Sequence, residues 1–491
     1  MDLTANWPPK LLAIALMLVL ELIIAYQVVK LHPLYLIFFL FVICILLFVF
    51  ISLENALLFL LIYMAFDGFI KNLTSYTPAF HVAKDVFLVI IFAVYLLGKI
   101  LKKEPLFPAT PLNIPILVFI AICFLQFLNP ATHPIIGLAG IKTHVLPIVL
   151  LPLSFSLFTN KKQINHFMIV IIALGTLVAT YSFVQYAQGP DSVAKLGPGF
   201  ANVVYDRAAL WKSASTKTIN FRPFSTTQDC GAAAMYYLIT IPLALAFLLT
   251  ERSWGRRKLL LIASIGLLFL ALVLSGVRSA WLATIMGLLL FGILSKKMRS
   301  FFIVLFLGGT AIYLATFLSG GGIIERILMT ANPWQAFMEA RGMNITTYLV
   351  WAIYAYPFGR GLGRAGPGEA VFAKWFPQEA GSFAGSDNYF LVMVYETGLI
   401  GALVILWITL AILFNGYRIY NQLQDKDLKW IAVGIMAAFF AMLLTWLAGP
   451  TLISNPASFY FWFLSGMLLK LGHITTSESS PAPTSREALS Q

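Results

Sequence analysis

The feature that most constrains this chain is a succession of apolar segments, each long enough to cross a lipid bilayer. A transmembrane helix needs roughly 20 mostly apolar residues. Of the 491 residues, 60% are hydrophobic and only 11% are charged, whereas a soluble protein carries about 25% charged residues. We therefore predict an all-α polytopic membrane helix bundle with about 12–14 transmembrane helices.

The predicted spans are numerous, and the third, sixth and last are marginal. If a marginal pair is re-entrant, the count falls from about fourteen to about twelve. The predicted spans are residues 11–28, 33–52, 54–69, 84–101, 111–128, 142–158, 164–186, 231–250, 259–275, 279–295, 301–318, 389–415, 428–447 and 457–472.

The basic residues of the short loops predict the orientation, because cytoplasmic loops are enriched in Lys and Arg. With the N-terminus inside, five basic clusters fall on one side, and both termini are predicted to be cytoplasmic. These clusters are Lys99, Lys102 and Lys103; Lys161 and Lys162; Arg252, Arg256, Arg257 and Lys258; Lys296, Lys297 and Arg299; and Arg418, Lys426 and Lys429.

The same topology divides the chain into four regions. We predict N-terminal transmembrane helices over residues 1–160, a core over 161–415, C-terminal transmembrane helices over 416–473, and a disordered cytoplasmic tail over 474–491. The core includes two long outer loops, 187–230 and 319–388. The second loop is expected to be largely helical and to lie on the membrane surface or over a cavity.

Charge and ligand spacing exclude several function classes. The net charge of +13 would suggest nucleic-acid binding in a soluble protein, but here it is explained by orientation in the membrane. The cysteines and histidines are scattered and lack metal-ligand spacing. We predict no nucleic-acid partner, no metal and no cofactor, and we interpret His133 and His144 as ordinary residues of the outer interface.

Arginines on the predicted outer side are the first candidates for chemistry. Arg278 lies in residues 275–281 (SGVRSAW), at a tight outer turn between two apolar spans. A guanidinium at this depth is costly unless an anion pairs with it, and a phosphate or pyrophosphate fits because Arg binds it bidentately. The alternative is an arginine that reaches the phosphates of ordinary lipids.

A glycine-rich segment, residues 357–364 (PFGRGLGR), is the second candidate. Alternate glycines let backbone N–H groups approach an anion closely. No strand precedes the segment, so a dinucleotide-binding motif is rejected. A phosphate-contacting turn and a simple bend in a loop both remain open.

The third candidate is the start of a long apolar helix. Asp387 and Asn388 are good helix N-cap residues, and Glu396 follows about two turns later, at membrane depth. A carboxylate there is a functional candidate, and the alternative is pairing with a buried arginine from another helix.

These stretches occur in an order that resembles the O-antigen ligase and O-antigen polymerase superfamily of bacterial inner-membrane glycosyltransferases. The resemblance covers roughly residues 165–415 and rests on residues 221–226 (FRPFST), 275–281 (SGVRSAW), 357–363 (PFGRGLG) preceded by Arg341 and Trp351, and 387–401, which contain DNYFL and ETGLIG. Where the ligases have a histidine at the start of the last helix, this chain has Asp387. That departure favours a polymerase over a ligase.

The resemblance implies a mechanism and a set of site residues. A polyprenyl-pyrophosphate-linked oligosaccharide would donate its reducing-end sugar to a hydroxyl of a second lipid-linked oligosaccharide. The implied pyrophosphate-binding residues are Arg222, Arg278, Arg341 and Arg360.

The other implied residues act on the acceptor hydroxyl and the sugars. Asp387 or Glu396 would accept the hydroxyl proton, and Trp351, Asn388 and Tyr389 would contact sugars, although single aromatic residues of this kind are commonly interface anchors. The implied partners are the lipid-linked oligosaccharide, the membrane and a chain-length regulator. A ligase, or a transporter of lipid-linked sugars, is the alternative function; internal repeats, common in transporters, are not apparent in the sequence.

Overall fold

The computed structural model describes residues 52–206, 209–212, 219–251, 254–318, 335, 338, 344–365 and 387–478. These residues form two compact units. The first contains residues 52–61 and 83–106, and the second contains 62–82 and the described residues from 107 onward. Helices α3 (Leu53–Leu73) and α4 (Pro78–Leu101) each contribute to both units. In the first unit, Lys84 pairs with Asp85 at 2.7 Å.

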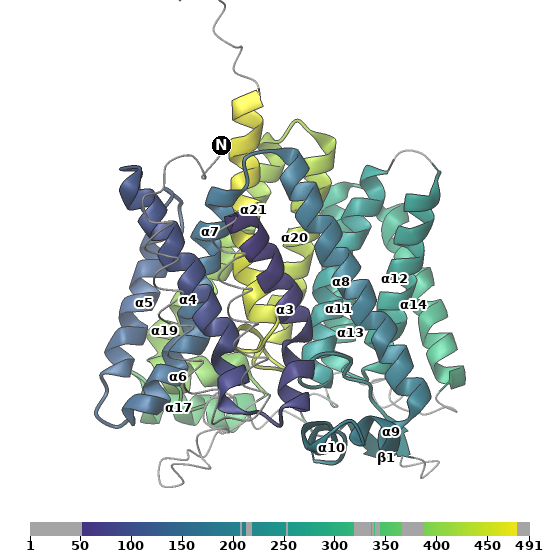
Figure 1. The fold of residues 1–491 in the computed structure, drawn as a ribbon, viewed down its shortest axis with the longest axis horizontal. Coiled ribbons are helices and arrows are strands. Elements are labelled where there is room, and N and C mark those ends of the chain that lie inside the picture. The colour runs from purple at the N-terminus through teal and green to yellow at the C-terminus, as the bar shows by residue number, and fades with distance from the viewer. Residues whose placement is uncertain are drawn as a thin grey trace, which may run out of the picture. The chain divides into compact units, whose positions relative to one another are not determined.

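The second unit is a bundle of helices with one short hairpin (Figure 1). Strands β1 (Leu210–Lys212) and β2 (Ile219–Phe221) pair antiparallel, with Leu210 opposite Phe221. The helices are α5 (Asn113–Phe127), α6 (Pro134–His144), η1 (Leu146–Val149), α7 (Leu150–Leu157), α8 (Lys161–Gln188), α9 (Pro190–Ala194), α10 (Pro198–Tyr205), α11 (Cys230–Thr250), α12 (Arg256–Leu274), α13 (Arg278–Ser295), α14 (Met298–Leu318), η3 (Asn344–Leu349), α17 (Val350–Ala355), α19 (Tyr389–Gln422), α20 (Lys426–Thr445), η5 (Thr451–Ile453) and α21 (Ala457–Glu478).

The predicted membrane bundle is confirmed. Among the described residues, nine helical segments are long and apolar enough to cross a membrane. Helices α5, α14 and α21 coincide with three further predicted spans. The first two predicted spans and most of loop 319–388 lie outside the described residues, and α21 continues to Glu478, past the predicted end of the last span.

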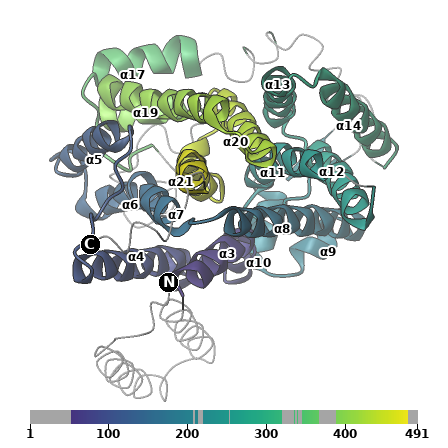
Figure 2. The same ribbon diagram turned by 90° about the horizontal axis from the view of Figure 1, so that it is seen from above.

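Helix α11 forms the core of the second unit and is almost wholly buried. It packs against α8, α12, α13 and α20, and α20 lies between α11 and α19 (Figure 2). A methyl group on Gly434 of α20 would come within 2.7 Å of the Ala246 side chain of α11. Small residues at this crossing let the two helices approach closely, as is usual inside membranes.

Two of the predicted spans are interrupted rather than continuous. The predicted sixth span, residues 142–158, is divided among α6, the 3-10 turn η1 and α7, and Pro147 lies in that turn. Proline lacks the N–H that a continuing α-helix requires. Helix α19 is kinked at Gly398, whose φ is 75°. Both interruptions lie next to the polar residues described below.

The two ends of the bundle differ in character. At one end, Lys161 of α8 pairs with Asp425 and Asp427 at 2.6 and 2.8 Å, and Lys297 lies 4.4 Å from the centre of the Trp430 ring. Three predicted cytoplasmic loops therefore meet there. Beyond the opposite end of α8, α9, α10 and the hairpin lie together (Figure 1).

Candidate functional site

Two of the four stretches that carry the family resemblance, residues 221–226 and 275–281, meet through Arg222. Its backbone N–H donates to the Ala209 carbonyl at 2.7 Å, and its Nε donates to the Ser275 carbonyl at 2.8 Å. Ser275 begins the turn that leads into α13, of which Arg278 is the first residue. The tertiary structure therefore brings the loop that carries Arg222 to the turn that precedes Arg278.

The loop that follows Arg222 is fixed by Gln185 of α8. The Gln185 side-chain oxygen accepts from the N–H groups of Phe224 and Ser225 at 3.1 and 2.7 Å, and its nitrogen donates to the Ser225 carbonyl at 2.9 Å. Ser225 has a left-handed φ of 54°, a conformation that needs such support in a non-glycine residue. A buried side chain thus holds the backbone beside Arg222 in place.

Arg278 is half-buried at the N-terminus of α13. Within the described part of the chain, its side chain has no ion pair with a carboxylate. The positive end of a helix dipole adds to the attraction for an anion at this position. The turn is held by Trp281, whose Nε1 donates to the Leu272 carbonyl at 2.8 Å.

The other two stretches, residues 357–363 and 387–401, meet around Glu396, which is fully buried. Its Oε2 lies 2.8 Å from Nε2 of His144 and accepts from the N–H of Gly363 at 2.8 Å. Its Oε1 accepts from the N–H of Ala365 at 2.8 Å. We call Glu396, His144 and these two backbone groups the Glu396 cluster; it joins α6, α19 and the glycine-rich loop.

The glycine-rich loop needs its glycines for both conformation and space. Gly359, Gly361 and Gly363 have φ values of 89°, 111° and 83°, which side chains rarely adopt. A methyl group on Gly363 would lie 2.2 Å from the Ile136 carbonyl oxygen. The anion that this loop approaches is the protein's own Glu396 carboxylate, so the N–H groups of Gly363 and Ala365 are not available to a phosphate.

Arg360 leaves the same loop toward aromatic rings. Its guanidinium carbon lies 5.3 and 5.7 Å from the ring centres of Tyr356 and Tyr395, and it donates to the Tyr395 hydroxyl at 2.5 Å. Trp351 stacks on Tyr395 with ring centres 6.4 Å apart, and 41% of Trp351 is exposed. A guanidinium and an accessible indole thus lie on one small surface, close to the Glu396 cluster.

The start of α19 confirms the predicted helix cap. Asn388 caps the helix by accepting from the Leu391 N–H at 3.0 Å, as predicted. Asn388 and Tyr389 are both buried, and the Tyr389 ring packs against Trp446 with centres 4.7 Å apart. Both side chains are therefore covered in this structure, and their contact with sugars stays a prediction. Asp387 is exposed, and Arg341 lies outside the described residues.

His144 is the residue that sequence reasoning missed. It was interpreted as an ordinary residue of the outer interface, but it is 4% exposed and contacts Glu396. The predicted alternative for Glu396, a buried arginine partner, is replaced by this histidine and the two backbone donors. A titratable side chain next to an apolar span was the available signal, since such residues inside membranes usually have a named partner.

Together these features define a polytopic membrane protein with arginines and buried polar clusters at the helix ends. Residues 263–406 match the family model described as O-antigen ligase. The match confirms, for this region, the resemblance to the O-antigen ligase and polymerase superfamily inferred from the sequence. The match includes Arg278, the glycine-rich loop and Glu396, whereas Arg222 lies before it. The comparison with curated proteins found no match.

Proposed function

We propose that this protein is a membrane glycosyltransferase that polymerises polyprenyl-pyrophosphate-linked oligosaccharide on the outer face of the bacterial inner membrane, for O-antigen, capsule or exopolysaccharide. The observation that carries the proposal is the meeting of Arg222 with the turn before Arg278. Two permanent positive charges on adjacent segments fit a pyrophosphate that gains negative charge as it leaves.

The reaction forms one glycosidic bond and breaks another. An acceptor hydroxyl attacks the anomeric carbon of the donor sugar, and the bond from that carbon to the pyrophosphate oxygen breaks. The electron pair leaves with the pyrophosphate, where Arg222 and Arg278 stabilise it, with Arg341 as a further predicted contact. The hydroxyl proton passes to a base, for which exposed Asp387 is the candidate.

Glu396 has a different role in this proposal. Both of its oxygens accept hydrogen bonds at 2.8 Å from fixed partners, which leaves the carboxylate poorly suited to receive a proton from a substrate. We assign it as a positioning residue. By holding the backbone on both sides of Arg364 and the loop that carries Arg360, it sets where these guanidinium groups lie.

Arg360 and Trp351 suit the approach of a sugar linked to a phosphate. The exposed Trp351 ring offers an apolar face to a pyranose, and Arg360 lies beside the Tyr395 ring on which Trp351 stacks. We propose that this surface guides the donor, with Arg360 as a secondary contact to its pyrophosphate.

The choice of polymerase over ligase rests on Asp387. The ligases of the superfamily have a histidine where this chain has an exposed aspartate, so acceptor activation by a histidine is not available at that position. A polymerase uses the same lipid-linked glycan as donor and acceptor, and a chain-length regulator is its expected partner.

The test uses the purified full-length protein, a lipid-pyrophosphate-linked oligosaccharide and EDTA. A ladder of longer lipid-linked glycans is expected, since arginines can stabilise the leaving group without a divalent cation. A single product formed only after a separate acceptor is added would make the protein a ligase. Movement of intact lipid-linked sugar across proteoliposomes without any new glycosidic bond would instead indicate a transporter.

A further inference from the structure

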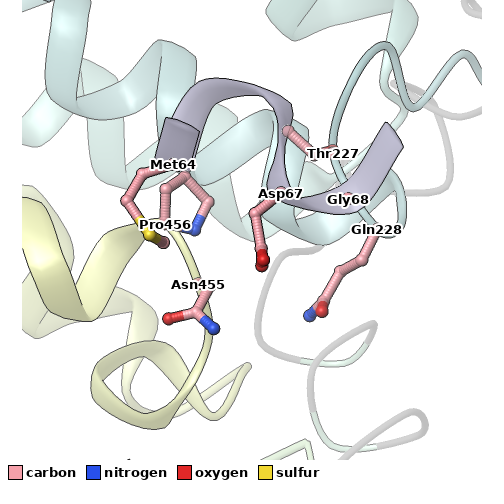
Figure 3. A pocket seen from close by; sticks show the side chains of 7 residues that line it. All are labelled: Met64, Asp67, Gly68, Thr227, Gln228, Asn455 and Pro456. Atoms are coloured by element: carbon pink, nitrogen blue, oxygen red, sulfur yellow. The ribbon is translucent and has the colours of Figure 1, made fainter. Parts of the chain in front are cut away.

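A small polar pocket lies between α3, the loop that follows Arg222, and the turn before α21. It is lined by Met64, Asp67, Gly68, Thr227, Gln228, Asn455 and Pro456. Figure 3 shows the Asp67 carboxylate between the side-chain amides of Asn455 and Gln228. Three hydrogen-bonding side chains from three separate segments therefore converge on one point.

The described residues of the protein use only part of the hydrogen-bonding capacity of the Asp67 carboxylate. It is 2% exposed, and its Oδ2 accepts from Nζ of Lys71 at 2.5 Å. Its Oδ1 is buried and has no hydrogen-bond partner among the described residues. A buried acceptor left without a donor is costly, so a donor that enters the pocket would be bound favourably.

The pocket is joined firmly to the loop that carries Arg222. The Phe69 N–H donates to the Thr226 carbonyl at 2.7 Å, and the Cys230 thiol donates to the Arg222 carbonyl at 3.2 Å. A methyl group on Gly68 would come within 2.0 Å of the Gln228 backbone nitrogen. The absence of a side chain at Gly68 lets α3 approach the loop, which places Asp67 beside the same loop as Arg222.

We infer that Asp67, Gln228 and Asn455 form a subsite that binds hydroxyl groups of the acceptor glycan. The carboxylate accepts a hydrogen bond from a hydroxyl, and the two amides can each donate or accept one. A cation is disfavoured because the Lys71 ammonium already neutralises this carboxylate. That the hydroxyls belong to a sugar rests on the proposed function.

Binding requires a small movement of the pocket walls. The space between the side chains has no room for a water molecule as they stand. Gln228 and Asn455 are half-buried, so either side chain can turn outward as a hydroxyl enters. Asp67 is held by Lys71 and stays in place as the fixed acceptor.

The experiment measures binding separately from transfer. The probe is the lipid-free oligosaccharide released by mild acid from the lipid-linked donor, titrated against full-length protein in nanodiscs and followed by saturation-transfer NMR. Asp67→Asn is expected to weaken binding about tenfold or more, as for loss of a hydrogen bond to a charged group. Asp85→Asn, which breaks the buried Lys84–Asp85 pair, serves as the matched control and should bind as the wild type does.

A second variant guards against simple misfolding. Asp67→Asn combined with Lys71→Met removes both buried charges, so no unpaired ammonium remains, and this protein should fold yet still bind the probe about tenfold more weakly. Wild-type affinity in either Asp67 variant would overturn the subsite, as would equal weakening in Asp85→Asn. A wild-type protein that binds the probe at Asp67 but forms no glycosidic bond would count against the proposed function alone.

Discussion

Two buried carboxylates in this bundle have opposite surroundings. Glu396 is fully buried and both of its oxygens accept hydrogen bonds, from His144 and from two backbone N–H groups. Asp67 is equally buried, but one of its oxygens accepts from Lys71 and the other has no hydrogen-bond partner in the part of the chain that the structure describes. Burial of a charged group inside a membrane protein is therefore not sufficient evidence of reactivity; the number of fixed partners separates the two cases.

The difference follows from what each carboxylate connects. Glu396 joins segments far apart in the sequence, at residues 144, 363–365 and 396, and so builds the fold around the glycine-rich loop. Asp67 is paired with a residue one turn away on its own helix. Glu396 is thus expected to govern stability, and Asp67 to govern ligand binding.

Arg278→Ala is expected to have the largest effect on activity. In the proposed reaction Arg278 stabilises the leaving pyrophosphate directly, which neither carboxylate does. The rate of glycan transfer should fall about 100- to 1,000-fold, as for loss of a preorganised charge in a transition state. The variant should remain folded and monodisperse, since the Arg278 side chain has no ion pair among the described residues. Arg256→Ala, at the start of α12, is the matched control; equal loss there would remove Arg278 from the mechanism.

Glu396→Gln tests whether the Glu396 cluster stabilises the folded protein. The substitution replaces one acceptor oxygen by an amide N–H donor, so a buried backbone donor loses its partner. The free energy of unfolding should fall by roughly 3 kcal/mol, as measured by thermal unfolding in detergent. His144→Phe keeps the two backbone donors on Glu396 and should cost less, about 1–2 kcal/mol. If Glu396→Gln lowers the free energy of unfolding no more than His144→Phe does, the Glu396 cluster does not stabilise the fold in the way described.

Gly363→Ala probes the loop that Glu396 holds. The new methyl group would require a φ of 83° and would lie 2.2 Å from the Ile136 carbonyl oxygen. A loss of about 2 kcal/mol in unfolding free energy is expected. Gly266→Ala in α12, where no atom of the described residues lies within 4 Å of the new methyl group, should be neutral or slightly stabilising. Wild-type stability in Gly363→Ala would show that the loop rearranges freely.

The smallest expected effect on stability is at the end of the bundle where Lys161 pairs with Asp425 and Asp427. Burial alone would raise the pKa of Asp425, but the Lys161 ammonium and the N–H groups of Asp427 and Leu428 hold the pKa below its ordinary value. A lowered pKa in the folded state stabilises above the pKa of the unfolded chain, and this contribution is lost as the pH falls through the folded-state pKa. It should amount to at most about 1 kcal/mol, because the pair is partly exposed.

Lys161→Met measures that contribution directly. The variant should lose part of its stability at neutral pH but should differ less from the wild type in acid, where Asp425 is protonated in both proteins. Thermal unfolding midpoints across the acidic range provide the comparison. A difference that does not change with pH would assign the effect to packing of the lysine chain.

Residue identity and order determined much of this protein before any tertiary contact was known. Apolar length predicted the bundle, because backbone groups in lipid must be satisfied within helices. The helix cap at Asn388 follows from local chemistry, and the order of FRPFST, SGVRSAW, the glycine-rich loop and ETGLIG indicated the superfamily. Each of these inferences depends on near neighbours or on residue type.

Only the tertiary structure decided which polar groups meet. No local pattern pairs His144 with Glu396, 252 residues apart, nor does any show that the glycine-rich loop binds an internal carboxylate rather than a phosphate. Nor does any local pattern show that the Tyr389 ring is buried against Trp446. Hydrogen bonds between distant segments depend on how the helices pack, and packing is set by the whole bundle. The sequence by itself therefore determined the class of protein and the residue types of the candidate site, and the packing of α3, α6 and α19 decided which carboxylate has fixed partners on both oxygens and which faces a pocket.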